Sequence, residues 1–98
     1  MLAKLIMNHN KQERKVAFYA DKLCITPKYL SEVVKEKTKK TPIEWINDSV
    51  IIIAKTFLKS TDLSIIHISE ELNFPNPSFF CRYFKKHTGI SPLKYREK

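Results

Sequence analysis

Residues 79–95 read FFCRYFKKHTGISPLKY and residues 29–45 read YLSEVVKEKTKKTPIEW, so that one pattern is written twice. In both stretches apolar residues recur at i, i+3 and i+4, which is the spacing of a helix with one buried face. A Ser-Pro or Thr-Pro pair and then an aromatic residue follow at the same distance in each copy. The copies are offset by 50 residues from these helices onward and by 49 before them, which places one extra residue in the second turn. We interpret the pattern as an internal duplication.

Each of these helices is preceded by a shorter amphipathic segment and a tight turn. Thr26 before Pro27 and Asn76 before Pro77 predict where the helices start. A side-chain oxygen can cap the first turn, and proline needs no intrahelical amide partner at the first position. Ser64 predicts the start of the segment before the second turn. Two short helices joined by a tight turn, the second with a polar outer face, are typical of a helix-turn-helix.

A longer helix is predicted between the two units. Thr41 and Pro42 mark its start, and one face stays apolar to about Lys59. The chain holds one glycine and shows no strand-type alternation, so we predict an all-α fold with two helix-turn-helix subdomains joined by a long connector helix. The apolar face of the connector consists of Ile43, Ile46, Val50, Ala54, Phe57 and Leu58. The predicted parts are a helix and linker remnant at 1–15, the first helix-turn-helix at 16–41, the connector at 42–60 and the second helix-turn-helix at 61–98.

Positive charge is concentrated at the end of the chain. The 98 residues carry 18 Lys and Arg against 10 Asp and Glu, a net charge of +8. Residues 75–98 hold six basic residues and one acid, so that +5 of this charge lies in the last quarter. Such a concentration in a small domain predicts a polyanionic partner, with a solvated lysine-rich surface as the alternative.

Several classes of function find no support in the sequence. No apolar run approaches the roughly 18 residues of a membrane span, and the opening residues lack a signal-peptide cleavage site, so we expect a cytoplasmic protein with no membrane partner. Metal-ligand spacing is absent among the cysteines and histidines, which are Cys24, Cys81, His9, His67 and His87. No catalytic carboxylate pair, nucleophile with a base or Gly-rich phosphate loop can be assembled. We therefore expect no catalytic residues, no enzyme activity, no cofactor and no metal.

The spacing of the two units suits double-stranded DNA. Successive turns of the major groove on one face of DNA lie roughly 34 Å apart. A connector of about 18 residues spans roughly 27 Å at the helical rise per residue. We therefore predict that one chain places a recognition helix in each of two adjacent groove segments.

Two stretches carry a family resemblance. SIIHISEELNF at 64–74 and SFFCRYFKKHTGISPLKYR at 78–96 resemble the C-terminal signature of the AraC/XylS family of bacterial transcription regulators. The similarity to the DNA-binding domain of this family runs from about Val16 to Arg96. The resemblance implies sequence-specific binding of double-stranded DNA for transcription control. It also implies a fragment of a longer, effector-responsive regulator, with residues 1–15 the end of the connection and no small-molecule ligand in this part.

The chain departs from the family pattern at four positions. Asn73 stands where the family commonly has Gly, a tolerable change because Asn enters the left-handed region more readily than other non-glycine residues. Ser69 stands where Ala is frequent, and Val50 stands where the family often has an Arg on the connector. In the first unit Lys39 occupies the position of Gly89, which is well placed to end its own helix in a left-handed conformation.

The resemblance implies that outward residues near the start of each recognition helix contact base edges. The candidates are Lys28, Ser31 and Glu32 in the first unit and Ser78, Cys81 and Arg82 in the second. Arg and Lys pair with guanine acceptors, and Glu can accept from cytosine N4. For Arg82 the alternative is a phosphate contact or a surface ion pair. For Glu32 it is an intrahelical pair with Lys28 or Lys35.

Other polar residues suit the DNA backbone. Lysines and the residues at helix starts can bind phosphate, although a solvated role is the alternative for each lysine. The candidates are Lys35, Lys39, Lys40, Thr41, Lys85, Lys86 and Ser91. The aromatic residues are expected in the core rather than on a platform that stacks single-stranded bases. They are Trp45, Phe79, Phe80, Tyr83, Phe84 and Tyr95.

Two alternatives remain beside sequence-specific binding of double-stranded DNA. A helical protein-interaction module would dock RNA polymerase or a partner subunit, and the mixed charge of the first recognition face leaves that open for the first unit. A nonspecific nucleic-acid binder would show affinity that falls steeply with salt and is indifferent to base sequence.

Overall fold

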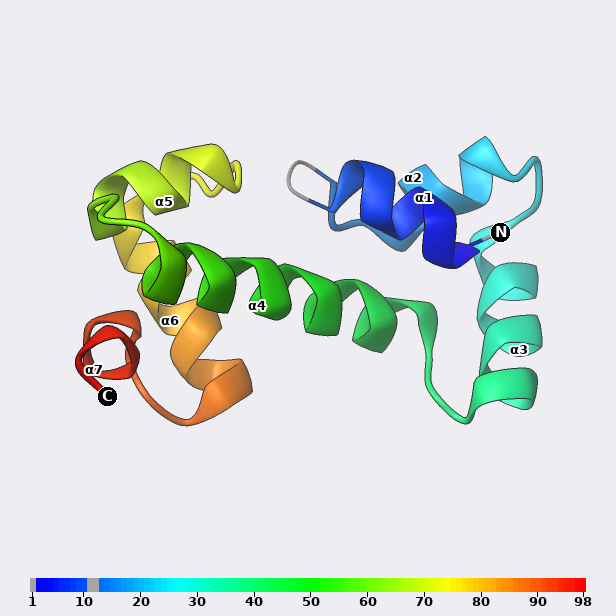
Figure 1. The fold of residues 1–98 in the computed structure, drawn as a ribbon. Helices are drawn as coiled ribbons and strands as arrows, with labels where there is room; N and C mark the ends of the chain where they lie inside the picture. Colours follow the sequence, from blue (N-terminus) through cyan, green and yellow to red (C-terminus); the bar gives the residue numbers. More distant parts are fainter. Residues whose placement is uncertain (1, 11–12) are drawn as a thin grey trace. The chain divides into compact units, whose positions relative to one another are not determined.

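The computed structural model describes residues 2–10 and 13–98, and within these ranges the chain forms helices and turns with no strand. The predicted all-α fold is confirmed (Figure 1). The helices are α1 (Leu2–His9), α2 (Val16–Lys22), α3 (Pro27–Thr38), α4 (Pro42–Ser60), α5 (Ile65–Glu71), α6 (Pro77–Thr88) and α7 (Pro92–Glu97). The chain divides into two compact units, Met1–Ser49 and Val50–Lys98, and α4 contributes to both. Residues 1, 11 and 12 of the predicted helix and linker remnant lie outside the described residues.

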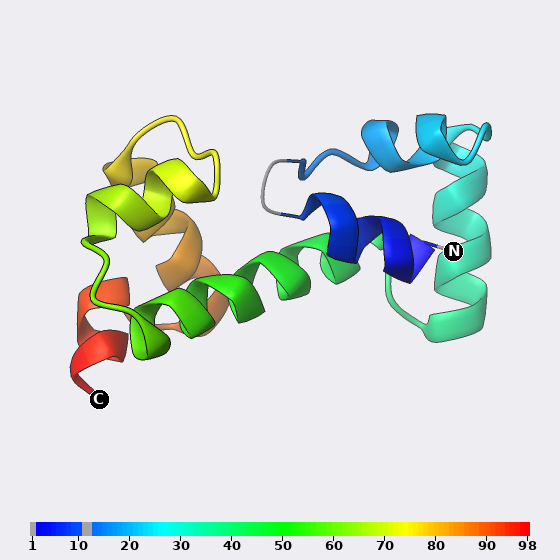
Figure 2. The same ribbon diagram turned by 45° about the horizontal axis from the view of Figure 1, so that its top comes forward.

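The first unit contains α1, α2, α3 and the beginning of α4. Figures 1 and 2 show α3 running steeply across the direction of α2, which is the arrangement of a helix-turn-helix. The buried apolar side chains of this unit are Ile6, Tyr19, Ala20, Leu30 and Ile46. Burial raises the pKa of Tyr19, and its hydroxyl donates a hydrogen bond of 2.9 Å to the carbonyl of Glu13.

The second unit contains the end of α4 with α5, α6 and α7. Helix α6 packs against both α5 and α7 (Figure 2). The buried apolar side chains are Val50, Ile51, Ala54, Leu58, Ile68, Leu72, Phe74, Phe80 and Phe84. Ser69, which stands where the family often has Ala, is buried, and its hydroxyl donates to the carbonyl of Ile66 at 2.7 Å. The hydroxyl is therefore accommodated without an unpaired polar atom.

The tight turns of the two units use the same backbone motif. In the first, the amides of Cys24 and Ile25 return to the carbonyls of Asp21 and Ala20, each at 3.0 Å. In the second, the amides of residues 73 and 74 return to carbonyls 70 and 69 at 3.0 and 2.9 Å. These are the paired bonds of a Schellman motif, which needs a left-handed residue after the helix. Cys24 and Asn73 supply it, both with φ of 59°.

The starts of the recognition helices α3 and α6 are fixed as predicted. The amide of Tyr29 donates to Thr26 Oγ1 at 3.1 Å, and the amide of Phe79 donates to Asn76 Oδ1 at 2.8 Å. Proline follows each capping residue. The shorter helix α5 begins in the same way, because the amide of His67 donates to the hydroxyl of Ser64 at 3.0 Å.

The ends of α3 and α6 are also alike. Thr38 Oγ1 donates to the carbonyl of Val34 and accepts from the amide of Lys40, and Thr88 makes the same bonds to Phe84 and Ile90. The next residue is left-handed in both cases, with φ of 66° at Lys39 and 87° at Gly89. The lysine therefore takes the conformation that is predicted only for the glycine. A threonine latch at each end fixes how the chain leaves the recognition helix.

Three predictions about burial are wrong. Phe79 is 44% exposed and Trp45 is 38% exposed, so they are not core residues. Ile43, assigned to the apolar face of the connector, is 41% exposed. The indole of Trp45 instead lies beside α3, where its Nε1 donates to Thr38 Oγ1 at 3.0 Å.

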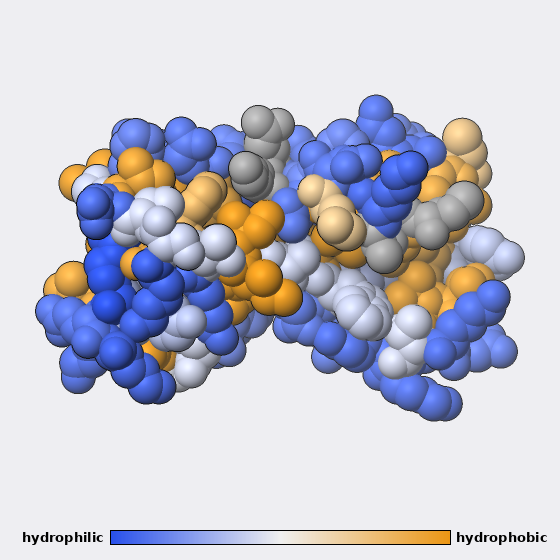
Figure 3. Space-filling view, in the orientation of Figure 1, coloured by the Kyte–Doolittle hydropathy of each residue, from blue (hydrophilic) through white to orange (hydrophobic). Residues whose placement is uncertain are grey.

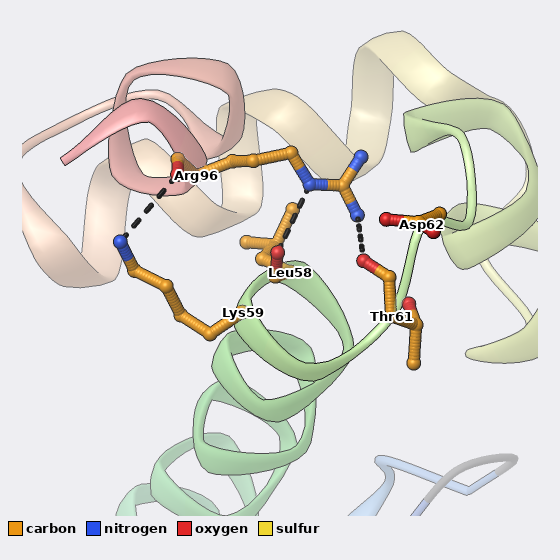
Figure 4. Close-up of a pocket in the computed structure, with 5 residues that line it drawn as sticks. All are labelled: Leu58, Lys59, Thr61, Asp62 and Arg96. Atoms are coloured by element: carbon orange, nitrogen blue, oxygen red, sulfur yellow. Dashed lines mark hydrogen bonds between the residues drawn. The ribbon is translucent and has the colours of Figure 1, made fainter.

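Arg96 ties α7 to the end of α4 (Figure 4). Its Nε donates to the carbonyl of Leu58 at 3.0 Å, and its Nη2 lies 3.4 Å from the carbonyl of Thr61 and 3.5 Å from that of Phe57. Carbonyls in the last turn of a helix have no intrahelical donor, so the guanidinium satisfies groups that α4 leaves open. Tyr95, next to it on α7, stacks edge-on against Phe84 of α6 at 5.6 Å. These bonds of Arg96, here called the Arg96 clamp, hold α7 in the position from which Tyr95 supports α6.

Candidate nucleic-acid interface

The exposed faces of the recognition helices carry most of the predicted contact residues. Figure 3 shows hydrophilic side chains over α7 and over the lower end of α3 in this view. On α3, Lys28, Glu32 and Lys35 are exposed, while Ser31 is half-buried. Lys39, at the end of this helix, is also exposed. The predicted residues of the first unit thus share one accessible side of α3.

On α6 the predicted residues surround a central arginine. Ser78, Arg82, Lys85 and Lys86 are exposed, and Cys81 is half-buried at the edge of this face. The exposed residues stand three or four positions from Arg82, the spacing at which helix side chains are neighbours. Helix α6 contains no acidic residue. The lysine and arginine charges of its outer face are therefore not offset by any acid of the same helix.

Phe79 belongs to the same accessible face of α6. Its ring centroid lies 5.9 Å from Cζ of Arg82, within the range of a cation–π interaction. The ring also lies beside that of Phe74, at 6.1 Å between centroids. Phe74 is 7% exposed and also packs on Phe80 and Tyr83. The aromatic cluster of the core thus extends outward to the guanidinium of Arg82.

The equivalent face of α3 has a different charge. With the offset of 50 residues, Glu32 stands where α6 has Arg82 and Glu36 stands where α6 has Lys86. Lys28 and Lys35 balance these two acids, so the four side chains sum to zero. An outward aromatic residue is kept, because Tyr29 stands at the position of Phe79 and is 57% exposed. The two faces therefore share an outward aromatic residue but differ in charge.

The predicted phosphate contacts at the helix starts already have partners within the chain. The Lys40 ammonium forms an ion pair with Asp48 and lies 4.2 Å from the centroid of the Trp45 ring. Thr41 and Glu44 form a capping box, in which the amide of Thr41 donates to Glu44 Oε1 at 3.0 Å. This bond, with a second from the Thr41 hydroxyl, lowers the pKa of Glu44. An anion at this helix start would therefore have to compete with a carboxylate.

The corresponding position in the second unit is more open to an anion. Ser91 caps α7 by accepting from the amide of Lys94 at 3.2 Å. Lys94 stands where Glu44 stands in the first unit, so the start of α7 has an exposed cation in place of a carboxylate. Ser91 and its counterpart Thr41 therefore differ in the charge beside them, which is a lysine at Ser91 and a glutamate at Thr41.

The sequence prediction missed three residues of this region. Tyr29 and Phe79 were not assigned to the contact surface, although their matching positions in the repeat would have identified them as a pair. Arg96 is one of the six basic residues at 75–98, but its guanidinium is engaged with α4. A local sequence pattern does not predict the hydrogen bond from Arg96 to Leu58, because these residues are 38 positions apart.

The described part of the chain contains neither a metal site nor a membrane-spanning helix. Among those residues no group of three or more His, Cys, Asp and Glu lies close enough to hold a metal ion. None of their helices is both long and apolar enough to cross a membrane. A shallow depression at the end of α4 is lined by the residues of the Arg96 clamp (Figure 4).

Two helix-turn-helix motifs with exposed second helices define a tandem helix-turn-helix domain. A family model described as a helix-turn-helix domain matches residues 19–98. The chain is 31% identical to the arabinose operon regulatory protein of Salmonella typhimurium over 81 aligned residues, and this aligned region covers 83% of the chain. The chain belongs to the AraC-type helix-turn-helix family, and the resemblance seen in the sequence is confirmed.

Solved structures agree with this assignment. The C-terminal domain of AraT, a response regulator from Geobacillus stearothermophilus, is 29% identical, with a TM-score of 0.90 over 98% of this chain and 80% of that one. The DNA-binding domain of AdpA, solved with a target DNA, shares the fold at 19% identity, with a TM-score of 0.85 over 98% of this chain and 86% of that one. The chain spans only 29% of the length of the Salmonella regulator.

Proposed function

We propose that the chain binds double-stranded DNA sequence-specifically and acts in bacterial transcription regulation. The observation that carries the proposal is the outer face of α6, where Arg82, Lys85 and Lys86 are exposed and no acid is present. A cationic helix face of this kind supplies phosphate attraction together with donors for guanine O6 and N7. The names of the relatives, which are regulatory proteins, support the same function.

The two recognition helices contribute unequally to DNA binding in this proposal. In this proposal α3 and α6 enter adjacent segments of the major groove, and α6 contributes most of the affinity because its face is cationic. Arg82 reads guanine, with Ser78 and Cys81 beside it. On α3, Lys28 and Ser31 contact bases and Glu32 accepts from cytosine N4. Backbone contacts come from Lys35, Lys39, Lys40, Thr41, Lys85, Lys86 and Ser91.

The chain acts as the DNA-binding part of a longer regulator in this proposal. The curated relatives extend well beyond the matched region, which supports a separate domain for effector sensing or dimerisation. RNA polymerase is the protein partner proposed for the longer regulator. Because the charge of α3 is mixed, docking of such a partner on α3 is the alternative to placing this helix in the groove. The function is that of a binding domain rather than an enzyme, and it is exercised in the cytoplasm.

Selection of random duplexes on the purified chain near physiological salt tests the proposal. We expect two short preferred blocks about one helical turn apart. Arg82→Ala should then weaken binding to the selected duplex by about 1–3 kcal/mol and leave binding to a scrambled duplex unchanged. Lys85→Ala is the matched control, since loss of a phosphate contact weakens both duplexes alike. An equal loss on both duplexes for Arg82→Ala would indicate a phosphate contact, and salt-sensitive binding without enrichment would leave only a nonspecific binder.

A further inference from the structure

Phe79 is an exposed aromatic ring on a face that is otherwise polar. The face is formed by Ser78, Arg82, Lys85 and Lys86, and 44% of the Phe79 side chain is open to solvent among them. Its backbone is fixed, because the amide donates to the capping side chain of Asn76 at 2.8 Å. Core packing does not account for the exposed part of the ring, and an apolar surface left in water gains free energy when a partner covers it.

The ring and the guanidinium of Arg82 form one composite surface. Phe74 supports the ring from the core side at 6.1 Å, and Arg82 lies over it at 5.9 Å. A guanidinium held over an aromatic face loses less rotamer freedom when it binds, so the stack orients Arg82 before it meets DNA. Whatever Arg82 contacts, Phe79 meets the group beside it.

Major-groove chemistry limits what that neighbouring group can be. Base edges in the major groove present hydrogen-bond donors and acceptors, and the only apolar group among them is the 5-methyl of thymine. Phenylalanine is one of the residues suited to contact this methyl, and arginine is suited to guanine. Adjacent base pairs are about 3.4 Å apart, so two stacked side chains can reach neighbouring pairs.

We infer that Phe79 and Arg82 act together as a reader of a thymine beside a guanine, with Phe79 contacting the thymine methyl. Phe79 is thus a specificity-determining residue that sets one base position in the block bound by α6. The inference rests on the proposed function, since it requires that α6 enter the major groove. It adds a base preference that the cationic residues alone do not supply.

The test removes the methyl group and nothing else. Each thymine of a selected duplex is replaced singly by deoxyuridine, and the dissociation constant of the unaltered chain is measured for each duplex. The guanine that Arg82 contacts is the one whose replacement makes Arg82→Ala and the unaltered chain bind alike. We expect the deoxyuridine substitution next to this guanine to lower the affinity about three- to fourfold, which is the effect of burying one methyl group. Phe79→Ala should bind the thymine and deoxyuridine duplexes equally.

Controls separate this contact from folding and from the first unit. Tyr29→Ala removes the equivalent ring of α3 and should keep the deoxyuridine penalty. Phe79→Leu retains an apolar group over Phe74 and should keep part of the penalty, and circular dichroism verifies that each variant is folded. Absence of a penalty at every thymine in the unaltered chain, or a penalty that persists in Phe79→Ala, overturns the inference while leaving sequence-specific binding intact. Failure to enrich any duplex removes the proposed function and the inference together.

Discussion

Replacing Arg96 by Ala should destabilise the second unit by about 2 kcal/mol. Only the bond from Nε to the carbonyl of Leu58, at 3.0 Å, falls within the usual range of 2.7–3.2 Å. The two Nη2 contacts, at 3.4 and 3.5 Å, are too long to count at full strength. A hydrogen bond from a charged donor contributes about 1.5–3 kcal/mol, and the half-buried position of Arg96 favours the lower part of that range.

Urea unfolding followed by circular dichroism measures this loss, and amide hydrogen exchange locates it. Protection should fall first in α7 and in the last turn of α4, because the guanidinium joins these two segments. Arg96→Lys should recover less than half of the loss, since an ammonium keeps the charge but not the planar fork.

The matched control is Lys94→Ala, which removes an exposed cation from the same helix. We expect it to change the free energy of unfolding by less than about 0.5 kcal/mol. If Arg96→Ala and Lys94→Ala have the same small effect, the bonds to α4 do not stabilise the unit and the reasoning fails.

Three further predictions concern local structure. Gly89→Ala should lower the free energy of unfolding by about 1 kcal/mol, purely through its φ of 87°, because an added Cβ would meet no atom within 4 Å; an unchanged urea midpoint would contradict this. Cys24→Gly should raise it by about 0.5 kcal/mol, since relief of about 1–2 kcal/mol of left-handed strain exceeds the flexibility cost of about 0.5–1 kcal/mol. Glu44→Gln should flatten the acid side of the stability profile. The bond from the Thr41 amide lowers the folded-state pKa of Glu44. The carboxylate therefore contributes fully to the free energy of unfolding above the usual pKa of about 4.3, and this contribution is lost as pH falls through the lowered pKa. Stability profiles of equal slope for the variant and the unaltered chain would refute this prediction.

Local chemistry is what the sequence predicted well. The capping roles of Thr26, Ser64 and Asn76 are confirmed, because each depends on a side chain and an amide three residues away. The left-handed end at Gly89 is also confirmed, because glycine has no Cβ and takes a positive φ readily. Cys24 takes this conformation without any signal from its residue type, and only its alignment with Asn73 could have indicated it.

Burial and long-range contacts were harder to predict. Helical spacing shows which side of a helix faces the core, but not how wide the buried stripe is, and Trp45 and Phe79 lie at its margin. The bond from Arg96 to α4 depends on how distant segments meet, which periodicity does not encode. The base and phosphate contacts remain predictions, because they depend on a nucleic acid outside the chain.

The paired threonine latches have a consequence for how such domains diversify. Thr38 and Thr88 fix the exits of the two recognition helices through bonds to backbone groups, and none of the predicted base-contacting side chains takes part in these bonds. A library that varies only outward positions, such as Glu32 and Arg82, therefore leaves both frames unaltered. In the proposed mode of DNA binding, the two halves can then be retargeted one at a time, each by exchanging a few solvent-facing side chains.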